Sequence, residues 1–93
     1  MVLDERGRLM TSLALADWLG ARLNEGTQHV IFAIGPADGW SESVREEARN
    51  RGALLSISPM TFAHQLARLV MAEQLYRACT ILTGHPYHRG NGL

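Results

Sequence analysis

A continuous run of apolar, strand-favouring residues, HVIFAIG (29–35), constrains the fold more than any other segment of the chain. A strand with one face in solvent alternates apolar and polar residues, whereas an unbroken apolar run is typical of a strand covered on both faces. Strands of that kind occur in parallel sheets that carry helices. We therefore predict a strand over 29–35, within an α/β fold.

The chain before this run reads as a short strand and a helix. Val2 and Leu3 are followed by charged residues and a glycine, which predicts the last residues of a strand and then a loop. Thr11 or Ser12 is placed to cap a helix. Apolar residues then recur at helical spacing until the Asn-Glu-Gly stop at 24–26.

The chain after the run repeats the alternation. Ser41 is placed to cap a second helix, which runs to about Arg51 before a glycine. ALLSIS (53–58) predicts a third strand, and Thr61 is placed to cap a last helix that starts near Phe62. The resulting order, β-α-β-α-β-α, predicts a parallel sheet with right-handed crossovers.

The last helix has no continuous polar face. His64 and Arg68 lie on one side, while Glu73 and Arg77 lie nearly opposite, at about 100° per residue. Apolar residues fill much of the remaining surface: Leu66, Leu69, Val70, Leu75 and Tyr76. We expect this helix to be packed by its own domain and by a second chain, which predicts a homodimer.

The charge is balanced overall but uneven along the chain. Nine arginines and no lysine face nine acidic residues, so no global basic field points to nucleic acid. Arginine nevertheless suits bidentate phosphate contacts, which leaves RNA open as a partner. From residue 64 onward, Arg68, Arg77 and Arg89 stand against Glu73 alone, so the C-terminal third is locally positive.

The composition also limits the compartment and the chemistry. Cys79 is the single cysteine, which leaves neither an internal disulfide nor a thiolate metal cage. The first residues lack the apolar segment of a signal peptide. No apolar run approaches the ~20 residues that span a bilayer. A cytoplasmic protein with no membrane partner is the expectation.

Two loops follow the second and third predicted strands, GPADG (35–39) and SISPMT (56–61). Ligands of α/β sheets bind at the carboxyl ends of strands, so we expect these loops to be neighbours and to form a pocket. Ordinary turn chemistry is the alternative for the first loop. The chain lacks G-x-G-x-x-G and a phosphate-loop lysine, which argues against dinucleotides and nucleoside triphosphates.

The C-terminal run EQLYRACTILTGHPYHR (73–89) gathers titratable and aromatic groups. Glu73 and Arg77 are spaced for an ion pair on one helix, and a purely structural salt bridge remains an alternative. His85 and His88 lack the further ligands of a zinc site. No nucleophile elbow supports serine hydrolase chemistry.

Four segments carry a resemblance to a known family: LDERG (3–7), FAIGPADG (32–39), SISPMTFAHQLARLVMAEQLYRA (56–78) and HPYHR (85–89). They resemble the ribosomal RNA large subunit methyltransferase H family of the SPOUT superfamily, in register over essentially the whole chain. Members of that family are longer at the N-terminus, so the chain is similar to their C-terminal portion. It departs from the family pattern at Pro36, Ala63 and Gln65.

This resemblance implies a parallel α/β sheet with a trefoil knot, the rare exception to unknotted connections. It implies a homodimer that uses S-adenosylmethionine, without a metal, to methylate N3 of a pseudouridine in large-subunit ribosomal RNA of the assembled ribosome. A truncated, non-catalytic remnant that keeps a dimerisation, RNA-binding or cofactor-binding surface is the alternative function.

The resemblance also assigns residues to the site. It places the cofactor at Leu3, Gly35, Pro36, Gly39, Ser58, Pro59, Met60, Thr61, Phe62 and Ala63. It places an active site built with the partner protomer at the HPYHR tail, and the catalytic candidates are His88, Arg89, Tyr87, Glu73 and Arg77. Among these, Tyr87 suits stacking on a base, and the two arginines suit phosphate contacts.

Overall fold

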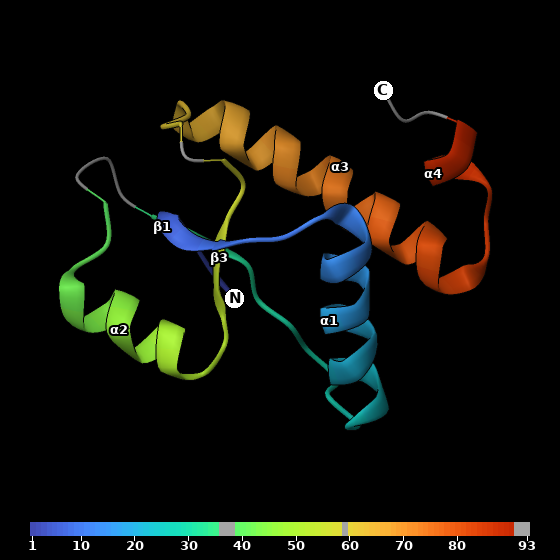
Figure 1. The fold of residues 1–93 in the computed structure, drawn as a ribbon, viewed down its shortest axis with the longest axis horizontal. Coiled ribbons are helices and arrows are strands. Elements are labelled where there is room, and N and C mark those ends of the chain that lie inside the picture. The colour runs from blue at the N-terminus through green and yellow to red at the C-terminus, as the bar shows by residue number, and fades with distance from the viewer. Residues whose placement is uncertain (36–38, 59, 91–93) are drawn as a thin grey trace.

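A three-stranded parallel sheet with the strand order β2-β1-β3 forms the centre of the fold (Figure 1). The computed structural model describes residues 1–35, 39–58 and 60–90, with side chains as far as residue 88. The strands are β1 (Val2–Leu9), β2 (Ala33–Ile34) and β3 (Leu54–Ser56). The helices are α1 (Ser12–Asn24), α2 (Glu42–Asn50), α3 (His64–Thr83) and α4 (Tyr87–Gly90). The predicted parallel α/β class is confirmed, and the trefoil knot stays a prediction.

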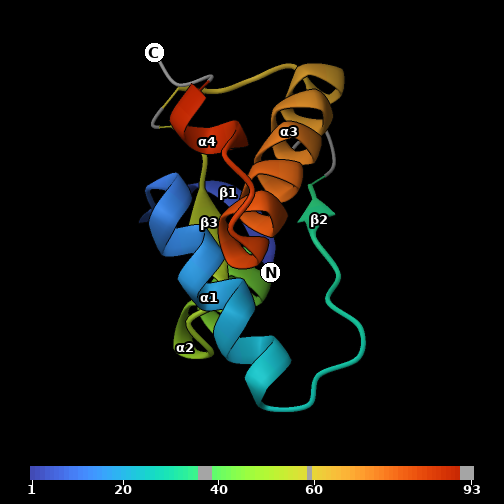
Figure 2. The same cartoon turned by 90° about the vertical axis from the view of Figure 1, so that its right-hand side faces the viewer.

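Helices cover the sheet from two sides. α2 packs against β1 and β3 on one side, while α1 and α3 pack against each other on the other side (Figures 1 and 2). The predicted caps of α1 and α2 are confirmed, because Thr11 Oγ1 accepts from Ala14 N at 3.0 Å and Ser41 Oγ accepts from Val44 N at 3.4 Å. Leu3, Leu15, Leu55 and Met71 form the larger buried cluster between the sheet and these helices.

β2 and β3 are shorter than predicted. The run 29–35 yields only Ala33–Ile34, which pair with Val2 and Leu3 of β1. Residues before Ala33 lie beyond the start of β1, so they have no strand to pair with, and Ile31 is 77% exposed. The predicted strand over 53–58 is likewise reduced to Leu54–Ser56.

β1 is longer than predicted and is interrupted in the middle. Val2–Leu3 pair with Leu54–Leu55, and after a register shift Arg8–Leu9 pair with Leu55–Ser56. In the part of the sheet that the structure describes, residues 4–7 pair with neither neighbouring strand. The prediction of a strand stub followed by a loop is therefore wrong, because the chain returns to β3 after an arch, which we define as residues 4–7.

Gly7 makes this return possible, because the backbone of β3 passes so close that a side chain at this position has no room. A Cβ at Gly7 would lie 2.7 Å from the backbone carbon of Leu55 and 2.9 Å from that of Leu54. We expect Gly7→Ala to lower the free energy of unfolding in urea by about 1–3 kcal/mol, the usual cost of overpacking. Gly20→Ala is the control, since its Cβ would meet only the terminal methyl of Leu82 and alanine favours a helix. Equal effects of the two variants would contradict this account of the return to β3.

α3 begins two residues later than predicted and without the predicted cap. Its first residue is His64, its N-cap is Ala63, and no side chain caps it. Thr61 instead donates from Oγ1 to Glu5 Oε2 at 2.9 Å, so the predicted cap is wrong. At the other end, Gly84 takes a left-handed conformation with φ 78°, which ends α3 and turns the chain toward α4.

Candidate functional site

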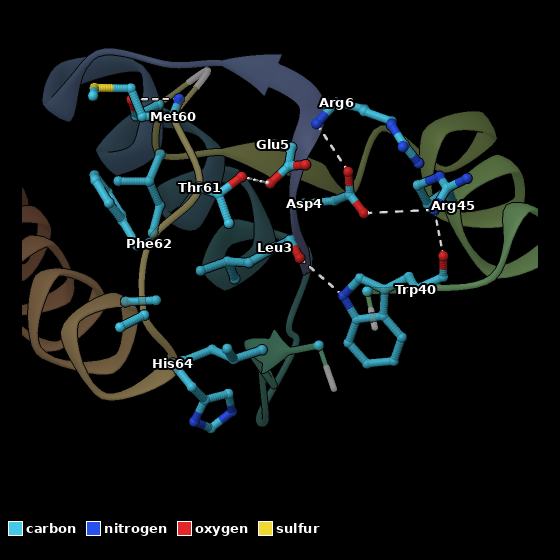
Figure 3. Close-up of a pocket in the computed structure, with 17 residues that line it drawn as sticks. Leu3, Asp4, Glu5, Arg6, Trp40, Arg45, Met60, Thr61, Phe62 and His64 are labelled. Atoms are coloured by element: carbon cyan, nitrogen blue, oxygen red, sulfur yellow. Dashed lines mark hydrogen bonds and ion pairs between the residues drawn. The ribbon is translucent and has the colours of Figure 1, made fainter. Parts of the chain in front are cut away.

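A pocket of about 470 Å³ lies where β2 and β3 give way to loops, β1 forms its arch and α3 begins (Figure 3). The loops after β2 and β3 both line it, as predicted, although the two strands are not neighbours, because β1 lies between them. The arch of β1 supplies the wall between the two loops. The reversal of strand order at β1 is the usual place for a ligand in an open α/β sheet.

Trp40 forms one wall of the pocket. Its indole Nε1 donates to the carbonyl oxygen of Leu3 at 2.8 Å, which joins the loop after β2 to β1 (Figure 3). Gly35 lies directly against this ring, because a Cβ there would be 2.8 Å from Trp40 Nε1. The glycine is therefore required by close packing, and its backbone stays accessible from the pocket.

Arg45 of α2 supports this wall from behind. Its Nη1 donates to the carbonyl oxygen of Trp40 and lies 3.9 Å from Asp4 Oδ2, and its Nη2 lies 2.5 Å from Glu42 Oε2. The pKa of the exposed Glu42 carboxyl is lowered, mainly by the hydrogen bond from Arg45 and secondly by the positive charge of Arg45. Arg45 Nε is buried and has no hydrogen-bond partner among the described residues. The contacts that hold this arginine are therefore those of its two terminal nitrogens.

Glu5 and Thr61 connect the arch to the opposite loop. Their hydrogen bond joins residues 56 positions apart, and both side chains are exposed. Ser58 organises the same loop, since its Oγ accepts from Met60 N at 3.0 Å. Two carboxylates, Asp4 and Glu5, thus line the pocket together with two arginines, Arg6 and Arg45, and the remaining lining is mostly backbone, hydroxyl, aromatic and apolar groups.

A second group of candidate side chains, the tail cluster of Glu73, Arg77, Tyr87 and His88, lies on α3 and α4. Glu73 Oε1 accepts from Arg77 Nε at 2.8 Å and lies 2.7 Å from Arg77 Nη2. Tyr87 OH donates to the same oxygen at 3.3 Å, and Arg77 Nη1 contacts His88 Nδ1 at 2.9 Å. The Arg77 guanidinium also lies 4.9 Å from the centre of the Tyr87 ring. Arg77 is therefore a largely buried cation that is paired with Glu73, and 11% of its side chain is exposed.

None of the tail cluster lines the pocket in the described part of a single chain. The pocket is at the first turn of α3, whereas the tail cluster is packed along its second half (Figure 1). The described residues contain no group of three or more His, Cys, Asp or Glu side chains placed to hold a metal ion. No helix among them is both long and apolar enough to cross a membrane.

A family profile described as "Predicted SPOUT methyltransferase" matches residues 1–88. The chain belongs to the SPOUT methyltransferase family. The resemblance drawn from the sequence motifs is thereby confirmed at the level of the family.

Curated relatives of this SPOUT chain include a protein from Koribacter versatilis, 50% identical over 91 residues, which are 98% of this chain and 60% of that protein. A Bartonella henselae protein is 49% identical over 96% of the chain and 54% of its own length. A Trichlorobacter lovleyi protein is 46% identical over 95% and 56% respectively. Each relative is named ribosomal RNA large subunit methyltransferase H. The chain spans a little over half the length of the curated relatives it matches.

Most residues that the SPOUT resemblance assigned to a cofactor come together in the pocket. These are Leu3, Gly35, Gly39, Ser58, Met60, Thr61, Phe62 and Ala63. Pro36 and Pro59 lie outside the described residues. Arg89 belongs to α4, and its side chain is outside the described part.

Sequence reasoning missed several residues of the pocket wall: Asp4, Glu5, Arg6, Trp40, Arg45 and His64. The charged letters DER were a usable signal, because they directly follow Val2 and Leu3, where the first strand was predicted to end. Arg45 had no such signal, since its contacts with Asp4 and Trp40 depend on how α2 packs on β1.

Proposed function

We propose that the chain is the catalytic part of an S-adenosylmethionine-dependent methyltransferase that acts on N3 of a pseudouridine in large-subunit ribosomal RNA. The observation that carries the proposal is the pocket at the carboxyl ends of β2 and β3, beside the arch of β1, in a chain of the SPOUT methyltransferase family. The names of the relatives support ribosomal RNA as the substrate. Three properties of the pocket and the tail cluster add to this.

The pocket fits the proposed cofactor. A volume of about 470 Å³ lies within the range of roughly 300–1,000 Å³ that small-molecule sites occupy. Gly35 leaves backbone where a side chain would meet Trp40, which allows close approach of a ligand. Asp4 and Glu5 offer carboxylates to the ammonium and the sulfonium of this ligand, and Arg6 offers a cation to its carboxylate. S-adenosylmethionine would supply an activated methyl group, and the loops after β2 and β3 would hold it.

The tail cluster is proposed to bind and orient the RNA. Methyl transfer to a ring nitrogen is an in-line displacement, so the chain's main task is to place the nucleophile. An unstacked base suits Tyr87 of the tail cluster, and a phosphate suits Arg89, the residue after His88 in the chain. These assignments place the RNA beside α3, next to an exposed apolar surface.

A second copy of the chain is proposed to bring the tail cluster and the pocket together. Leu66, Leu69 and Tyr76 are 48%, 67% and 54% exposed, and their spacing puts them on the face of α3 that also carries Glu73. A partner covering these residues would reach the tail cluster. A two-fold interface would then present one chain's tail to its partner's pocket.

Leu69→Glu tests this interface. We expect the variant to shift the chain from dimer to monomer, because a charge at the centre of a dry interface is left unpaired. Light scattering coupled to gel filtration over a concentration series measures the change. Leu23→Glu is the control, since Leu23 is 56% exposed but lies at the end of α1. A parent chain that is a folded monomer at every concentration would refute the homodimer.

The methylation proposal is tested in two steps. Calorimetry with S-adenosylmethionine measures cofactor binding by the 93-residue chain. Isolated ribosomes, separated subunits and protein-free ribosomal RNA are then supplied with labelled donor, and the modified nucleoside is identified by mass spectrometry. The assay is repeated with a chimera that carries the N-terminal part of the Koribacter versatilis relative. We expect N3-methylpseudouridine on ribosomes; binding without methylation in either form would favour the non-catalytic alternative.

A further inference from the structure

A chain of hydrogen bonds connects the tail cluster to the start of α1. Ser12 Oγ donates to Gln74 Oε1 at 2.6 Å, and Gln74 Nε2 donates to Glu73 Oε2 at 2.8 Å. The other oxygen of Glu73 binds Arg77 and Tyr87. Both carboxylate oxygens of Glu73 are therefore engaged. The position of the Arg77 guanidinium therefore depends on α1 as well as on α3. The two helices are joined here by Ser12 and Gln74, which are 62 residues apart in the sequence.

The contact between Arg77 and His88 fixes which imidazole nitrogen carries a hydrogen. A guanidinium has five N–H donors and no acceptor, and it stays charged in proteins. His88 Nδ1, 2.9 Å from Arg77 Nη1, must therefore be the acceptor. A neutral imidazole that accepts at Nδ1 carries its hydrogen at Nε2. His88 thus presents an N–H donor on the side of the ring away from Arg77.

We propose that His88 serves methyl transfer as a hydrogen-bond donor through Nε2, and that Gln74, held by Ser12, is a positioning residue for this state. The inference rests on the proposed function. The target nitrogen of a uracil-type base lies between two carbonyl groups, which take up negative charge when N3 loses its hydrogen. A donor fixed on one of those oxygens stabilises that charge.

The same geometry removes His88 as the general base. Its Nδ1 is occupied by Arg77, and its Nε2 already carries a hydrogen. Glu73 is committed to Arg77, Tyr87 and Gln74. In the transfer, the N3–H bond breaks and its proton passes to water. The N3–carbon bond forms, and the electron pair of the breaking carbon–sulfur bond returns to sulfur.

Nitrogen NMR of histidine-labelled protein tests the tautomer independently of activity. Long-range ¹⁵N–¹H spectra distinguish protonated from unprotonated ring nitrogens, and comparison with His88→Gln assigns the signals. We expect His88 to be a single tautomer with hydrogen at Nε2. A hydrogen on Nδ1, or an even mixture of tautomers in the parent chain, would overturn the proposal.

Variants show what holds the tautomer. Arg77→Met is expected to let both tautomers be populated, and Gln74→Leu to do so to a smaller extent while the buried arginine remains. Arg22→Met is the control, because Arg22 pairs with Glu25 on α1 and does not contact the tail cluster. A His88 spectrum unchanged in both Arg77→Met and Gln74→Leu would contradict the positioning role.

Methylation by two His88 variants separates a donor from a base. The glutamine side-chain nitrogen is an N–H donor at about the reach of Nε2, whereas leucine has none. We expect His88→Leu to slow methylation about 100-fold, as when one donor to a developing oxyanion is removed. His88→Gln keeps a donor, so we expect it to slow methylation only about tenfold. Equal losses would refute the donor role. An inactive parent would refute the proposed function instead, and the NMR result would stand.

Discussion

Gly35→Arg is expected to abolish binding of S-adenosylmethionine. Any side chain at Gly35 displaces the Trp40 ring, since its Cβ would be 2.8 Å from Nε1, and so breaks the hydrogen bond from Trp40 to Leu3. An arginine then occupies space in the pocket itself and places a cation near a cofactor that carries two positive groups. Calorimetry should detect no heat of binding at concentrations that saturate the parent chain.

Two further variants, a smaller substitution at Gly35 and a control substitution outside the pocket, show whether the loss of binding comes from filling the pocket. Gly35→Ala moves Trp40 without filling the pocket, so we expect an intermediate loss of affinity. Gly26→Asn is the control, because Gly26 is far from the pocket, has open space around it and has φ 83°, which asparagine tolerates. If Gly35→Arg binds the cofactor or its demethylated product as well as the parent does, the pocket is elsewhere.

His88→Ala and Arg89→Ala are each expected to slow methylation of ribosomes at least ~100-fold, the usual size of a lost hydrogen-bond donor or positioning contribution. Cofactor affinity should change little, because the residues that line the pocket, and not those of the tail, are proposed to hold the cofactor. Single-turnover methylation of ribosomes measures the first effect, and calorimetry measures the second.

Arg68→Ala is the matched control for the tail variants. Arg68 is an exposed arginine of the C-terminal third, and its Nη1 donates to Gln65 Oε1 on its own helix at 3.3 Å. The Arg68→Ala variant should methylate ribosomes at the parent rate. Methylation at the parent rate by both tail variants would mean that the tail only fastens the end of α3.

The order of the elements could be predicted from the sequence because its causes are local. Thr11 and Ser41 cap helices through bonds to residues three positions later, and such bonds depend little on the rest of the chain. The i,i+4 spacing of Glu73 and Arg77 likewise predicted a pair, which the structure contains at 2.7 Å.

The lengths of the strands and the role of Thr61 could not be predicted in the same way. A strand extends only as far as a neighbour accepts its hydrogen bonds, so HVIFAIG yields two paired residues beside β1. The partner of Thr61 is Glu5, which only the folded arch brings within reach. Long-range partners of this kind leave no periodic trace in a single sequence.

The pocket could be predicted in outline and the tail cluster only in part. Loops at strand ends were enough to locate most of the predicted residues that line the pocket. The partner of His88 depends on the left-handed turn at Gly84, which brings α4 back against α3. Its tautomer follows only from that contact.

The arch of β1 has a consequence for local opening of the fold. Residues 4–7 are outside the strand ladders on both sides, so this segment can open at a lower free energy than the core strands around Leu3 and Leu55. A bound ligand stabilises only the closed state, by an amount that grows with its concentration. Amide hydrogen exchange in the arch should therefore slow on binding, while exchange in β3 stays the same. Such a local footprint would report occupancy of the pocket in variants that transfer no methyl group.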